Sequence, residues 1–320
     1  MNAHTTHAGV VDSFGDPDRF RLEELPLSAL GAGEVQVRVA AVAVNPVDLA
    51  TRAGKIIPAE AARFPMIVGW DAAGTVEAVG EGVAHWQVGD RVAAMTVQPA
   101  DQNGTYAGYL NVAADLLALV PDGVSLEQAA TVPLAALTAS QMLGWVDRPA
   151  RGTLLVDAPL GAVGRFVVQL ARSAGILVVA VTKPEDGDPV RELGASEVVN
   201  RGAFAAAVRG LCPQGVDAAI DLVGGATAHS SLASVRDGGA YITAVPPFLD
   251  ETGPSTSQRD IRFEIQNAHP DAPVLARLLG AIDRGELSAR IERTYPLAQA
   301  AAAHRRQAEG GLRGKLVLLP

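Results

Sequence analysis

Cysteine is nearly absent from this sequence, and so are clusters of positive charge. Cys212 is the one cysteine among 320 residues, which excludes an internal disulfide and a zinc cluster made of thiolates. The net charge is −9, and no run of Lys and Arg exceeds pairs such as Arg305-Arg306. We therefore expect no nucleic-acid partner, because binding a polyanion requires a basic surface.

Long hydrophobic runs and targeting signals are also missing. No stretch reaches the roughly 18 apolar residues that a membrane helix needs, and the first residues, MNAHTTHAGVV, lack a basic start. A single cysteine suits a reducing compartment. The sequence predicts a soluble, uncleaved, cytoplasmic protein with no membrane partner.

Apolar residues, in contrast, are plentiful. Hydrophobic residues make up 48% of the chain and charged residues 19%, which is the balance of a globular protein. A length of 320 residues predicts two domains. Residues 31 to 120 carry short β-branched runs broken by turn residues, which predict a mostly β barrel or sandwich. Near residue 122 the pattern changes, and Ser125 followed by Gln128 makes a capping box at a helix start.

The second half alternates apolar strands with amphipathic helices. Strands are predicted over 152–158, 176–182, 196–200, 216–224 and 239–245, and helices over 162–175, 188–195 and 203–212. Strands buried on both faces and separated by helices are typical of a doubly wound parallel sheet. From about residue 261 the chain returns to helix and then ends in the strand-like GKLVLLP. The fold class predicted is therefore α/β in this half.

The segment VDAPLGAVGRFVVQL joins the first of these strands to a helix. Its pattern is Ala158-x-x-Gly161-x-x-Gly164, in which small residues let the backbone approach a diphosphate at the helix N-terminus. A proline and a leucine fall at the variable positions, and a proline at a helix start loses only an amide without an intrahelical partner. The pattern predicts a dinucleotide site formed by Ala158, Gly161, Ala162, Val163 and Gly164. The alternative is a tight turn that binds nothing.

The end of the second predicted strand distinguishes NAD from NADP. An acidic residue there would bind the ribose 2′-hydroxyl of NAD, whereas a 2′-phosphate prefers a hydroxyl and a cation. The sequence has Thr182 and Lys183 at this point, and Arg201 follows the next strand. NADP(H) is therefore favoured, although Glu185 and Asp186 come close behind. The alternative for Thr182, Lys183 and Arg201 is a solvated loop.

Six further stretches carry a resemblance that covers nearly the whole chain. They are NPVDLATRAG (45–54), FPMIVGWDAAGTVEAVGEGV (64–83), VGDRVAA (88–94), GTYAGYLNV (104–112), ATVPLAALTASQML (130–143) and GLRGKLVLLP (311–320). In this order they resemble the zinc-independent quinone oxidoreductases of the medium-chain dehydrogenase/reductase superfamily. The resemblance implies a GroES-like β domain over 1–122, completed by 261–320, and a Rossmann NADP-binding domain over 123–260.

The same resemblance implies an activity. A cleft between the two domains would bind NADPH and a quinone or enone substrate, in a homodimer that pairs through GAYITAV as an edge strand. Zinc-dependent relatives carry a catalytic cysteine and a Gly-His-Glu block, whereas this sequence has Gly69-Trp70-Asp71 at the matching place. The six histidines are scattered, and we expect them in a frayed terminus or on the surface. Hydride would therefore reach a conjugated acceptor without help from a metal.

The resemblance also points to catalytic residues. Asn45 and Asp48 would line the active cleft, with Asn45 donating a hydrogen bond to the substrate oxygen, where negative charge develops. Asn45 would also contact the cofactor. The alternative for this pair is a turn and a helix cap. Thr138 resembles the threonine that faces the nicotinamide, and its alternative is a hydroxyl bonded to its own helix. Gly224 and Val245 match stretches that bracket the cofactor.

Other residues and functions stay open at this point. Trp70 narrows the pocket or fills the core, and Tyr106 and Tyr109 are candidate proton donors. Lys315 is expected on the surface, and the alternative is a place near the cleft. The sequence has no Gly-x-Ser-x-Gly elbow, which excludes an α/β serine hydrolase. An enoyl or other double-bond reductase remains an alternative, as does an NADPH-binding sensor or structural protein without turnover.

Overall fold

The computed structural model describes residues 5–97, 103–146, 152–202, 204–245 and 256–320. Contacts within the chain divide it into two compact units, Met1–Leu137 with His269–Pro320 (unit 1) and Thr138–Ala268 (unit 2). The domain limits near residues 122 and 260 mark changes in sequence pattern and stay predictions. In the described part of the chain, no helix is long and apolar enough to cross a membrane.

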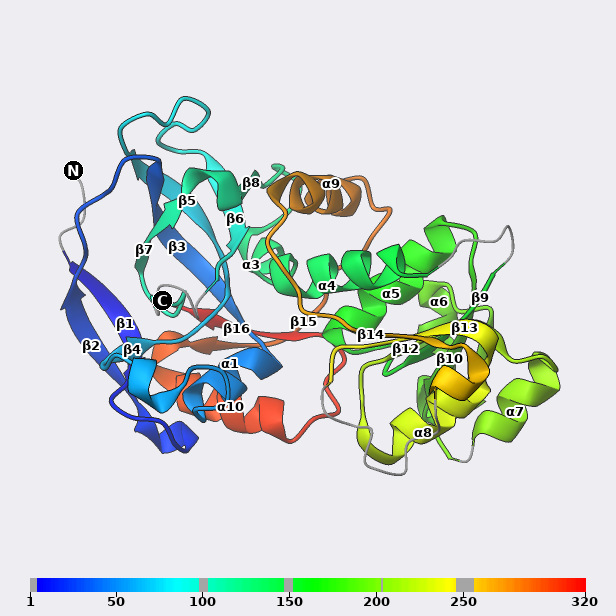
Figure 1. The fold of residues 1–320 in the computed structure, drawn as a ribbon. Helices are drawn as coiled ribbons and strands as arrows, with labels where there is room; N and C mark the ends of the chain where they lie inside the picture. Colours follow the sequence, from blue (N-terminus) through cyan, green and yellow to red (C-terminus); the bar gives the residue numbers. More distant parts are fainter. Residues whose placement is uncertain (1–4, 98–102, 147–151, 203, 246–255) are drawn as a thin grey trace. The chain divides into compact units, whose positions relative to one another are not determined.

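Unit 1 is built on a seven-stranded sheet in the order β15-β16-β3-β5-β6-β8, with β7 paired to β3 (Figure 1). The strands are β3 (Glu34–Val44), β5 (Asp71–Val79), β6 (Arg91–Met95), β7 (Tyr109–Ala113), β8 (Leu117–Leu119), β15 (Ile291–Pro296) and β16 (Lys315–Leu319). Strand β16 runs antiparallel to β3, with Leu316 opposite Val44. The C-terminal strand is therefore part of the sheet formed by the first half of the sequence.

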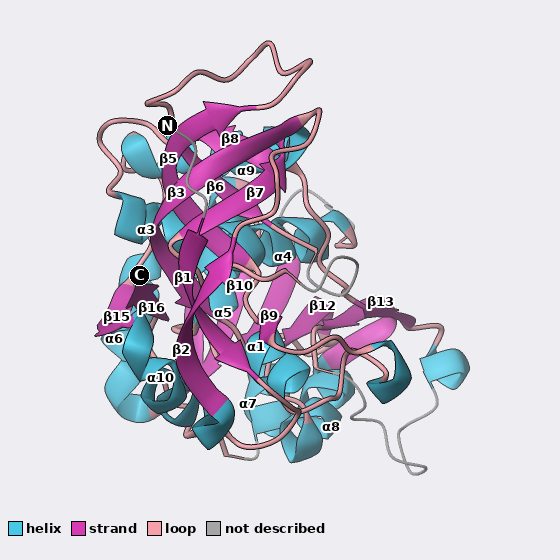
Figure 2. Ribbon diagram, turned by 90° about the vertical axis from the view of Figure 1, so that its left-hand side faces the viewer, coloured by secondary structure: helices cyan, strands magenta, loops and turns pink. Residues whose placement is uncertain are grey.

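A second sheet of unit 1 has the order β2-β1-β4. Its strands are β1 (Thr5–Val11), β2 (Phe20–Pro26) and β4 (Met66–Ile67). Strands β1 and β2 form a long antiparallel hairpin (Figure 2). The sequence patterns did not predict this hairpin, because β2 has no fully buried residue and so no apolar run marks it.

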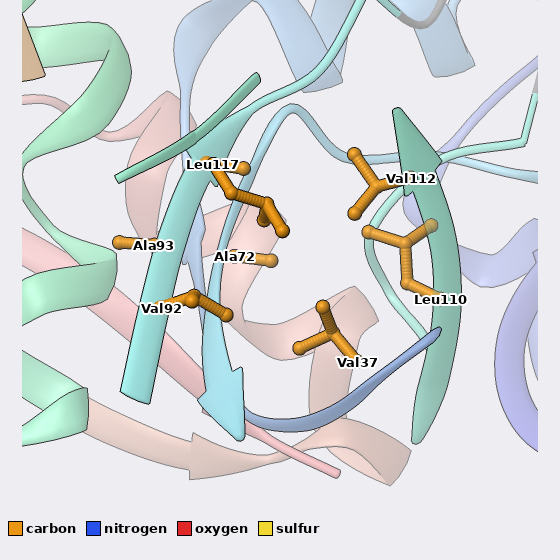
Figure 3. A pocket seen from close by; sticks show the side chains of 8 residues that line it. Val37, Ala72, Val92, Ala93, Leu110, Val112 and Leu117 are labelled. Atoms are coloured by element: carbon orange, nitrogen blue, oxygen red, sulfur yellow. The ribbon is translucent and has the colours of Figure 1, made fainter. Parts of the chain in front are cut away.

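The core of unit 1 is formed by apolar side chains of these strands. A small cavity in this core is lined by Val37, Ala72, Val92, Ala93, Ala94, Leu110, Val112 and Leu117. Figure 3 shows the side chains of Val37, Val92, Leu110, Val112 and Leu117 pointing toward a common space. Its volume of about 10 Å³ holds one water molecule at most, and its apolar lining offers water no hydrogen bond. The cavity is a packing gap inside the β structure.

Helices flank the strands of unit 1. They are α1 (Pro46–Arg52), α3 (Leu126–Ala130), α9 (Ala272–Asp283) and α10 (Ala300–Ala308), while α4 (Pro133–Gly144) crosses the limit between the units. The cap predicted at Ser125 is confirmed, because its hydroxyl accepts a hydrogen bond from the Gln128 N–H at 3.2 Å.

Unit 2 contains a six-stranded parallel sheet in the order β11-β10-β9-β12-β13-β14 (Figure 1). The strands are β9 (Thr153–Asp157), β10 (Leu177–Thr182), β11 (Glu197–Asn200), β12 (Val216–Asp221), β13 (Val235–Thr243) and β14 (Arg262–Ile265). Counted from β9, this is the order 3-2-1-4-5-6 of a dinucleotide-binding Rossmann sheet. The doubly wound α/β fold predicted from the sequence is confirmed.

The helices that pack on this sheet, within the described residues, include α5 (Ala162–Ser173), α6 (Gly187–Leu193), α7 (Phe204–Leu211) and α8 (Gly225–Ser234). Helices α7 and α8 cover one face, where Phe204 and Leu232 pack with Leu155 and Val181. Figure 1 shows α5 on the opposite face. Because side chains alternate along a strand, Leu155 and Asp157 of β9 both face α8.

Two sequence predictions in this region were wrong. The first five residues of GAYITAV, 239–243, lie in β13, which is paired on both sides, with β12 and with β14, and so is no edge strand. The edge strand on this side of the sheet is β14, four residues in a stretch for which the sequence predicted helix. Because β14 is short and only partly buried, it has no continuous apolar run.

Candidate active site

The loop after β9 turns sharply at Ala158. Its φ of 48° lies in the left-handed region, which a Cβ disfavours. The Gly161 N–H donates to the Ala158 carbonyl at 3.0 Å, and Gly161 is the N-cap of α5. Among the described residues, no side chain caps this helix start. The amides of the first turn, at Ala162 and Val163, are therefore available to an anion.

Gly164 allows α5 to lie directly on this loop. A Cβ at this position would stand 2.2 Å from the Ala158 carbonyl oxygen and 2.9 Å from Pro159 Cα. Both atoms belong to the backbone, so neither can rotate away. This is the close packing of helix against loop that the glycine pattern predicts.

The other residues predicted to bind the cofactor lie at or just after the carboxyl ends of the parallel strands. Thr182 ends β10 and is buried, Lys183 follows it and is exposed, and the Arg201 N–H donates to the Thr182 carbonyl at 2.9 Å. Gly224 follows β12 with a φ of 73°, and Val245 follows β13. Parallel strands bring these positions to the same side of the sheet, at the carboxyl ends of its strands, where open α/β sheets bind ligands. Their contact with a cofactor stays a prediction.

A buried acidic pair at the carboxyl ends of two central strands was not predicted from the sequence. Asp157 ends β9 and Asp221 ends β12, on either side of the point where the strand order reverses. Asp221 accepts hydrogen bonds from the Val223 and Gly224 amides and from the Tyr241 hydroxyl. A single aspartate at a strand end is common, and only the register of β9 with β12 reveals the pair.

Asp157 itself is incompletely bonded. Its Oδ2 accepts a hydrogen bond from the Ser231 hydroxyl of α8, whereas Oδ1 is buried without a partner in the described structure. The pKa of Asp157 is raised to about 7, chiefly by burial and also by the charge of Asp221, while the Ser231 hydrogen bond and the charge of Arg201 oppose the shift. The carboxyl therefore titrates near neutral pH.

In unit 1, the side chain of Asn45 joins two buried charges. Its Nδ2 donates to Asp71 Oδ2 at 3.0 Å and to the Ala43 carbonyl at 3.4 Å, and its Oδ1 accepts from Lys315 Nζ. Lys315 Nζ lies 3.7 Å from Asp71 Oδ2. Lys315 is 4% exposed, so the expectation of a surface lysine was wrong. A lysine is rarely buried without a partner, and here the partners come from elements far away in the sequence.

Burial shifts the pKa of both charged groups. It raises the pKa of Asp71 and lowers the pKa of Lys315, while their mutual attraction opposes both shifts. Asp71 Oδ1 also accepts from the Leu134 N–H at 2.8 Å, at the start of α4. The charged pair is therefore held by several hydrogen bonds, as a buried ion pair requires.

Asp48 connects the group of Asn45, Asp71 and Lys315 to a second series of hydrogen-bonded, buried polar side chains. Its Oδ2 accepts from the Asn45 N–H at 2.7 Å, so the carboxylate caps the start of α1, as the alternative of a turn and a helix cap predicts. Tyr106 donates from its hydroxyl to the same oxygen at 3.2 Å, and His304 Nε2 lies 3.0 Å from that hydroxyl. Arg52 Nε donates to His304 Nδ1 at 3.3 Å.

The direction of the hydrogen bonds in this chain follows from Arg52. A guanidinium only donates, so His304 Nδ1 must accept, and a neutral imidazole then carries its hydrogen on Nε2. That hydrogen points to the Tyr106 oxygen, and the Tyr106 hydroxyl points to Asp48. His304 is fully buried, which corrects the expectation of a surface histidine, and burial lowers its pKa to about 3.

Asp48 receives all of these donors on one oxygen. Its Oδ1 is buried without a hydrogen-bond partner in the described residues. Burial raises the pKa of Asp48 to about 7, against the hydrogen bonds from Asn45 and Tyr106. Burial also raises the pKa of Tyr106, so this phenol is a poor acid and acts as a link in the chain.

The remaining predicted residues are placed as follows. Thr138 is buried in α4, in unit 2, and Trp70 is half-buried with its indole nitrogen unpaired in the described structure. Tyr109 lies in β7, outside the chain of hydrogen bonds that contains Tyr106. The structure thus brings Asn45, Asp48 and Tyr106 together. Within the described residues, no group of three or more His, Cys, Asp or Glu side chains is arranged to hold a metal.

Comparison with known proteins agrees with this architecture. Residues 31–122 match the alcohol dehydrogenase GroES-like domain family, and residues 193–318 match the family described as zinc-binding dehydrogenase. A 2-haloacrylate reductase from a Burkholderia species is 31% identical over 98% of both chains. A quinone oxidoreductase from Pseudomonas aeruginosa is 32% identical, over 96% of this chain and 98% of the relative. A solved structure of mycobacterial Rv1454c complexed with NADPH is 32% identical with a TM-score of 0.86, over 98% of this chain and 100% of that one.

A GroES-like β unit and a Rossmann sheet with a glycine loop after its first strand define an oxidoreductase of the medium-chain dehydrogenase/reductase superfamily. Identity above 30% along nearly the full length of both chains narrows the assignment further. This chain belongs to the quinone oxidoreductase family of that superfamily.

Proposed function

We propose that the chain is an NADPH-dependent oxidoreductase that delivers hydride to a quinone or a similar conjugated carbonyl without a metal. The loop after β9 carries this proposal. Gly164 packs α5 onto the Ala158 backbone, beside the strand-order reversal of a Rossmann sheet, and this arrangement suits a diphosphate. Support comes from the relative named quinone oxidoreductase and from the related mycobacterial structure that is complexed with NADPH.

Residues of unit 2 are proposed to hold the nucleotide. The amides of Gly161, Ala162 and Val163 bind the diphosphate, with Ala158 and Gly164 shaping the loop. Thr182, Lys183 and Arg201 bind the 2′-phosphate, because a hydroxyl and two cations follow neighbouring strands and the second strand ends without an acidic residue. Gly224 and Val245 complete the cofactor site after β12 and β13.

Residues of unit 1 and α4 are proposed to act on the acceptor. When bound, NADPH supplies the hydride from its nicotinamide ring. Thr138 faces the nicotinamide, and Asn45 and Asp48 face the acceptor, where a fixed donor stabilises negative charge on oxygen. Both hydrogens of the Asn45 amide are engaged by Asp71 and Ala43 in this structure, so the amide donates to an acceptor only after releasing one of them.

The proposal of metal independence rests on what surrounds Asp71. Where zinc-dependent relatives have a Gly-His-Glu block, this chain has Trp70 and Asp71, and an ammonium group, Lys315 Nζ, lies against the Asp71 carboxylate. A divalent cation bound there would be repelled by that ammonium group. The residues present therefore do not fit a catalytic zinc.

Nicotinamide absorbance provides the direct test. The purified chain is mixed with NADPH and phenanthrenequinone, and oxidation of NADPH is followed before and after exhaustive treatment with a chelator. We expect oxidation that depends on the quinone and is unchanged by the chelator. Tight binding of NADPH without oxidation of any acceptor would favour a sensor, and loss of activity with the chelator would refute metal independence.

Reduction of an activated carbon–carbon double bond is the second candidate. The observation that favours it is the relative named 2-haloacrylate reductase, which matches 98% of this chain. An enone and a haloacrylate offered beside the quinone separate the two functions through the ratio of their kcat/KM values.

Location and assembly complete the proposal. One cysteine among 320 residues supports a cytoplasmic enzyme. We propose a homodimer in which the edge strand β14 pairs with its copy, since an edge strand leaves backbone groups unpaired. Light scattering after size-exclusion chromatography tests this, and a monomer at micromolar concentration would refute it.

A further inference from the structure

Asp157 lies next to the loop that is proposed to bind the negatively charged diphosphate of the nucleotide. It is the last residue of β9 and directly precedes Ala158, where the diphosphate loop begins. Asp221 ends the neighbouring strand β12 on the same face of the sheet. A diphosphate bound after β9 would therefore approach two buried carboxyl groups. At least one of them must lose its charge for binding to be strong, because like charges repel strongly where water is excluded.

The hydrogen bonds show which of the two can be neutral. Asp221 has donors on both oxygens, from two backbone amides and from the Tyr241 hydroxyl, which is the surrounding of a carboxylate. Asp157 has one donor, the Ser231 hydroxyl, and its Oδ1 is buried without a partner in the described structure. Burying an ionised Oδ1 without a hydrogen-bond donor costs free energy. A protonated Oδ1 is itself a donor and needs only an acceptor, which a phosphate oxygen can provide.

We propose that Asp157 belongs to the nucleotide site as a neutral carboxylic acid, so that the chain takes up a proton on this residue when NADPH binds. The inference rests on the proposed function, because it requires a diphosphate at the loop after β9. It makes Asp157 a determinant of nucleotide affinity at neutral and alkaline pH, a role outside the glycine pattern of the loop.

The groups around Asp157 determine the sign of this effect. Asp221 of β12 favours the neutral acid, while Ser231 of α8 and Arg201 after β11 favour the carboxylate. Tyr241 of β13 is a phenol whose pKa burial raises, so it stays neutral. With the pKa of Asp157 near 7 in the free chain, NADPH affinity falls as pH rises above 7, by up to about tenfold per pH unit.

Calorimetry at about pH 8 tests the proposal, since proton uptake there must come from a group with a raised pKa. NADPH is titrated in buffers of different ionisation enthalpy, and the slope of the observed enthalpy gives the number of protons taken up. We expect Asp157→Asn to take up fewer protons than the original chain, by up to about one, and to lose most of the fall in affinity above pH 7. The 2′-phosphate also titrates, but its contribution cancels in this difference between the two proteins.

Three comparisons make the test specific. Asp188→Asn, an exposed aspartate of α6, should leave uptake unchanged. NADH, which has the diphosphate without the 2′-phosphate, should give the same difference between the original chain and Asp157→Asn. Ser231→Ala removes a donor to the carboxylate, so it should move the pH-dependent loss of affinity to higher pH, and it serves if Asp157→Asn fails to fold.

The outcomes are distinguishable. Equal uptake and equal pH dependence in the original chain and Asp157→Asn, or no effect of Ser231→Ala, would overturn the role of Asp157 while leaving NADPH binding intact. A difference seen with NADPH and not with NADH would overturn the assignment to the diphosphate. If the original chain binds neither nucleotide at any pH, the proposed function itself fails.

Discussion

Arg52 Nε donates a hydrogen bond to His304 Nδ1 at 3.3 Å, across 252 residues of sequence. This contact ties α1 to α10 and orients the imidazole toward Tyr106, which in turn donates to Asp48. This series of hydrogen bonds therefore ends on one oxygen of a buried carboxyl group, that of Asp48. Protons do not pass along it from the arginine end, because a guanidinium does not release its proton in a protein.

The pH dependence of stability reports on His304. Its pKa is about 3 in the folded chain and near 6.5 when unfolded, so between these values the unfolded state binds more protons and stability falls as pH falls. We expect His304→Gln to remove from this window a slope of about 1.4 kcal/mol per pH unit in the free energy of unfolding. Urea denaturation at several pH values measures it. His85→Gln, at an exposed position, is the control, and an unchanged slope for His304→Gln would contradict the prediction.

Tyr106→Phe should destabilise unit 1. The substitution removes the donor to Asp48 and the acceptor for the His304 hydrogen, and all of these groups are buried. We expect a loss of about 1–3 kcal/mol in the free energy of unfolding, the usual cost of leaving buried polar groups unpaired. Tyr109→Phe, the same change three residues later at the start of β7, should cost less than half as much. Similar losses for both variants would show that the chain of hydrogen bonds is dispensable.

Gly164→Ala should weaken both folding and nucleotide binding. Its Cβ would overlap backbone atoms of Ala158 and Pro159, so α5 must move away from the loop. We expect a loss of roughly 1–3 kcal/mol in stability and a weaker Kd for NADPH. Gly144→Ala in α4 has open space around the new Cβ and should be neutral or stabilising by up to about 1 kcal/mol. Thermal unfolding measures the change in stability, and fluorescence titration measures the Kd for NADPH. Wild-type NADPH affinity in Gly164→Ala would count against the loop assignment.

Lys183→Glu should distinguish NADPH from NADH. If Lys183 binds the 2′-phosphate, reversing its charge weakens NADPH by about tenfold to a hundredfold, the value of a hydrogen bond between charged groups. NADH lacks that phosphate and should bind almost as before. Lys55→Glu, at another exposed lysine, should alter neither Kd. An equal change for both nucleotides in Lys183→Glu would refute the assignment.

Lys315→Met should destabilise the chain strongly. The change leaves the Asp71 carboxylate buried without its cation, at an expected cost of about 3–5 kcal/mol. Adding Asp71→Asn removes the uncompensated charge, so the double variant should be more stable than the sum of the two single losses implies. Chemical denaturation of the four proteins measures the coupling, and strict additivity would show that the two groups do not interact.

Much of unit 2 could be predicted because its signals are local. Strand β9, the loop with Gly161 and Gly164, and helix α5 are consecutive in the chain, and each follows from residue spacing within about 30 positions. The predicted helix over 162–175 agrees with α5 to within two residues at its end. Strands β2 and β14 lacked such a signal, since no residue of either strand is fully buried.

The contacts of the buried polar groups, in contrast, could not be predicted from the sequence. Lys315 and His304 look like surface residues in the sequence, because a single Lys or His near the end of a chain is usually solvated. Their partners, Asp71 and Tyr106, lie about 200 residues or more away, and only the pairing of β16 with β3 and the packing of α10 bring them together. Asp157 and Asp221 are likewise joined only by the register of two strands.

The sequence by itself determined the order of elements, the α/β class, the glycine loop and the family, because periodicity and motif spacing act over short distances along the chain. Tertiary structure alone decided which charges are buried, which carboxyl group has a free oxygen and which tautomer His304 adopts. Those properties depend on neighbours in space and on exclusion of water, and neither can be read from the order of residues.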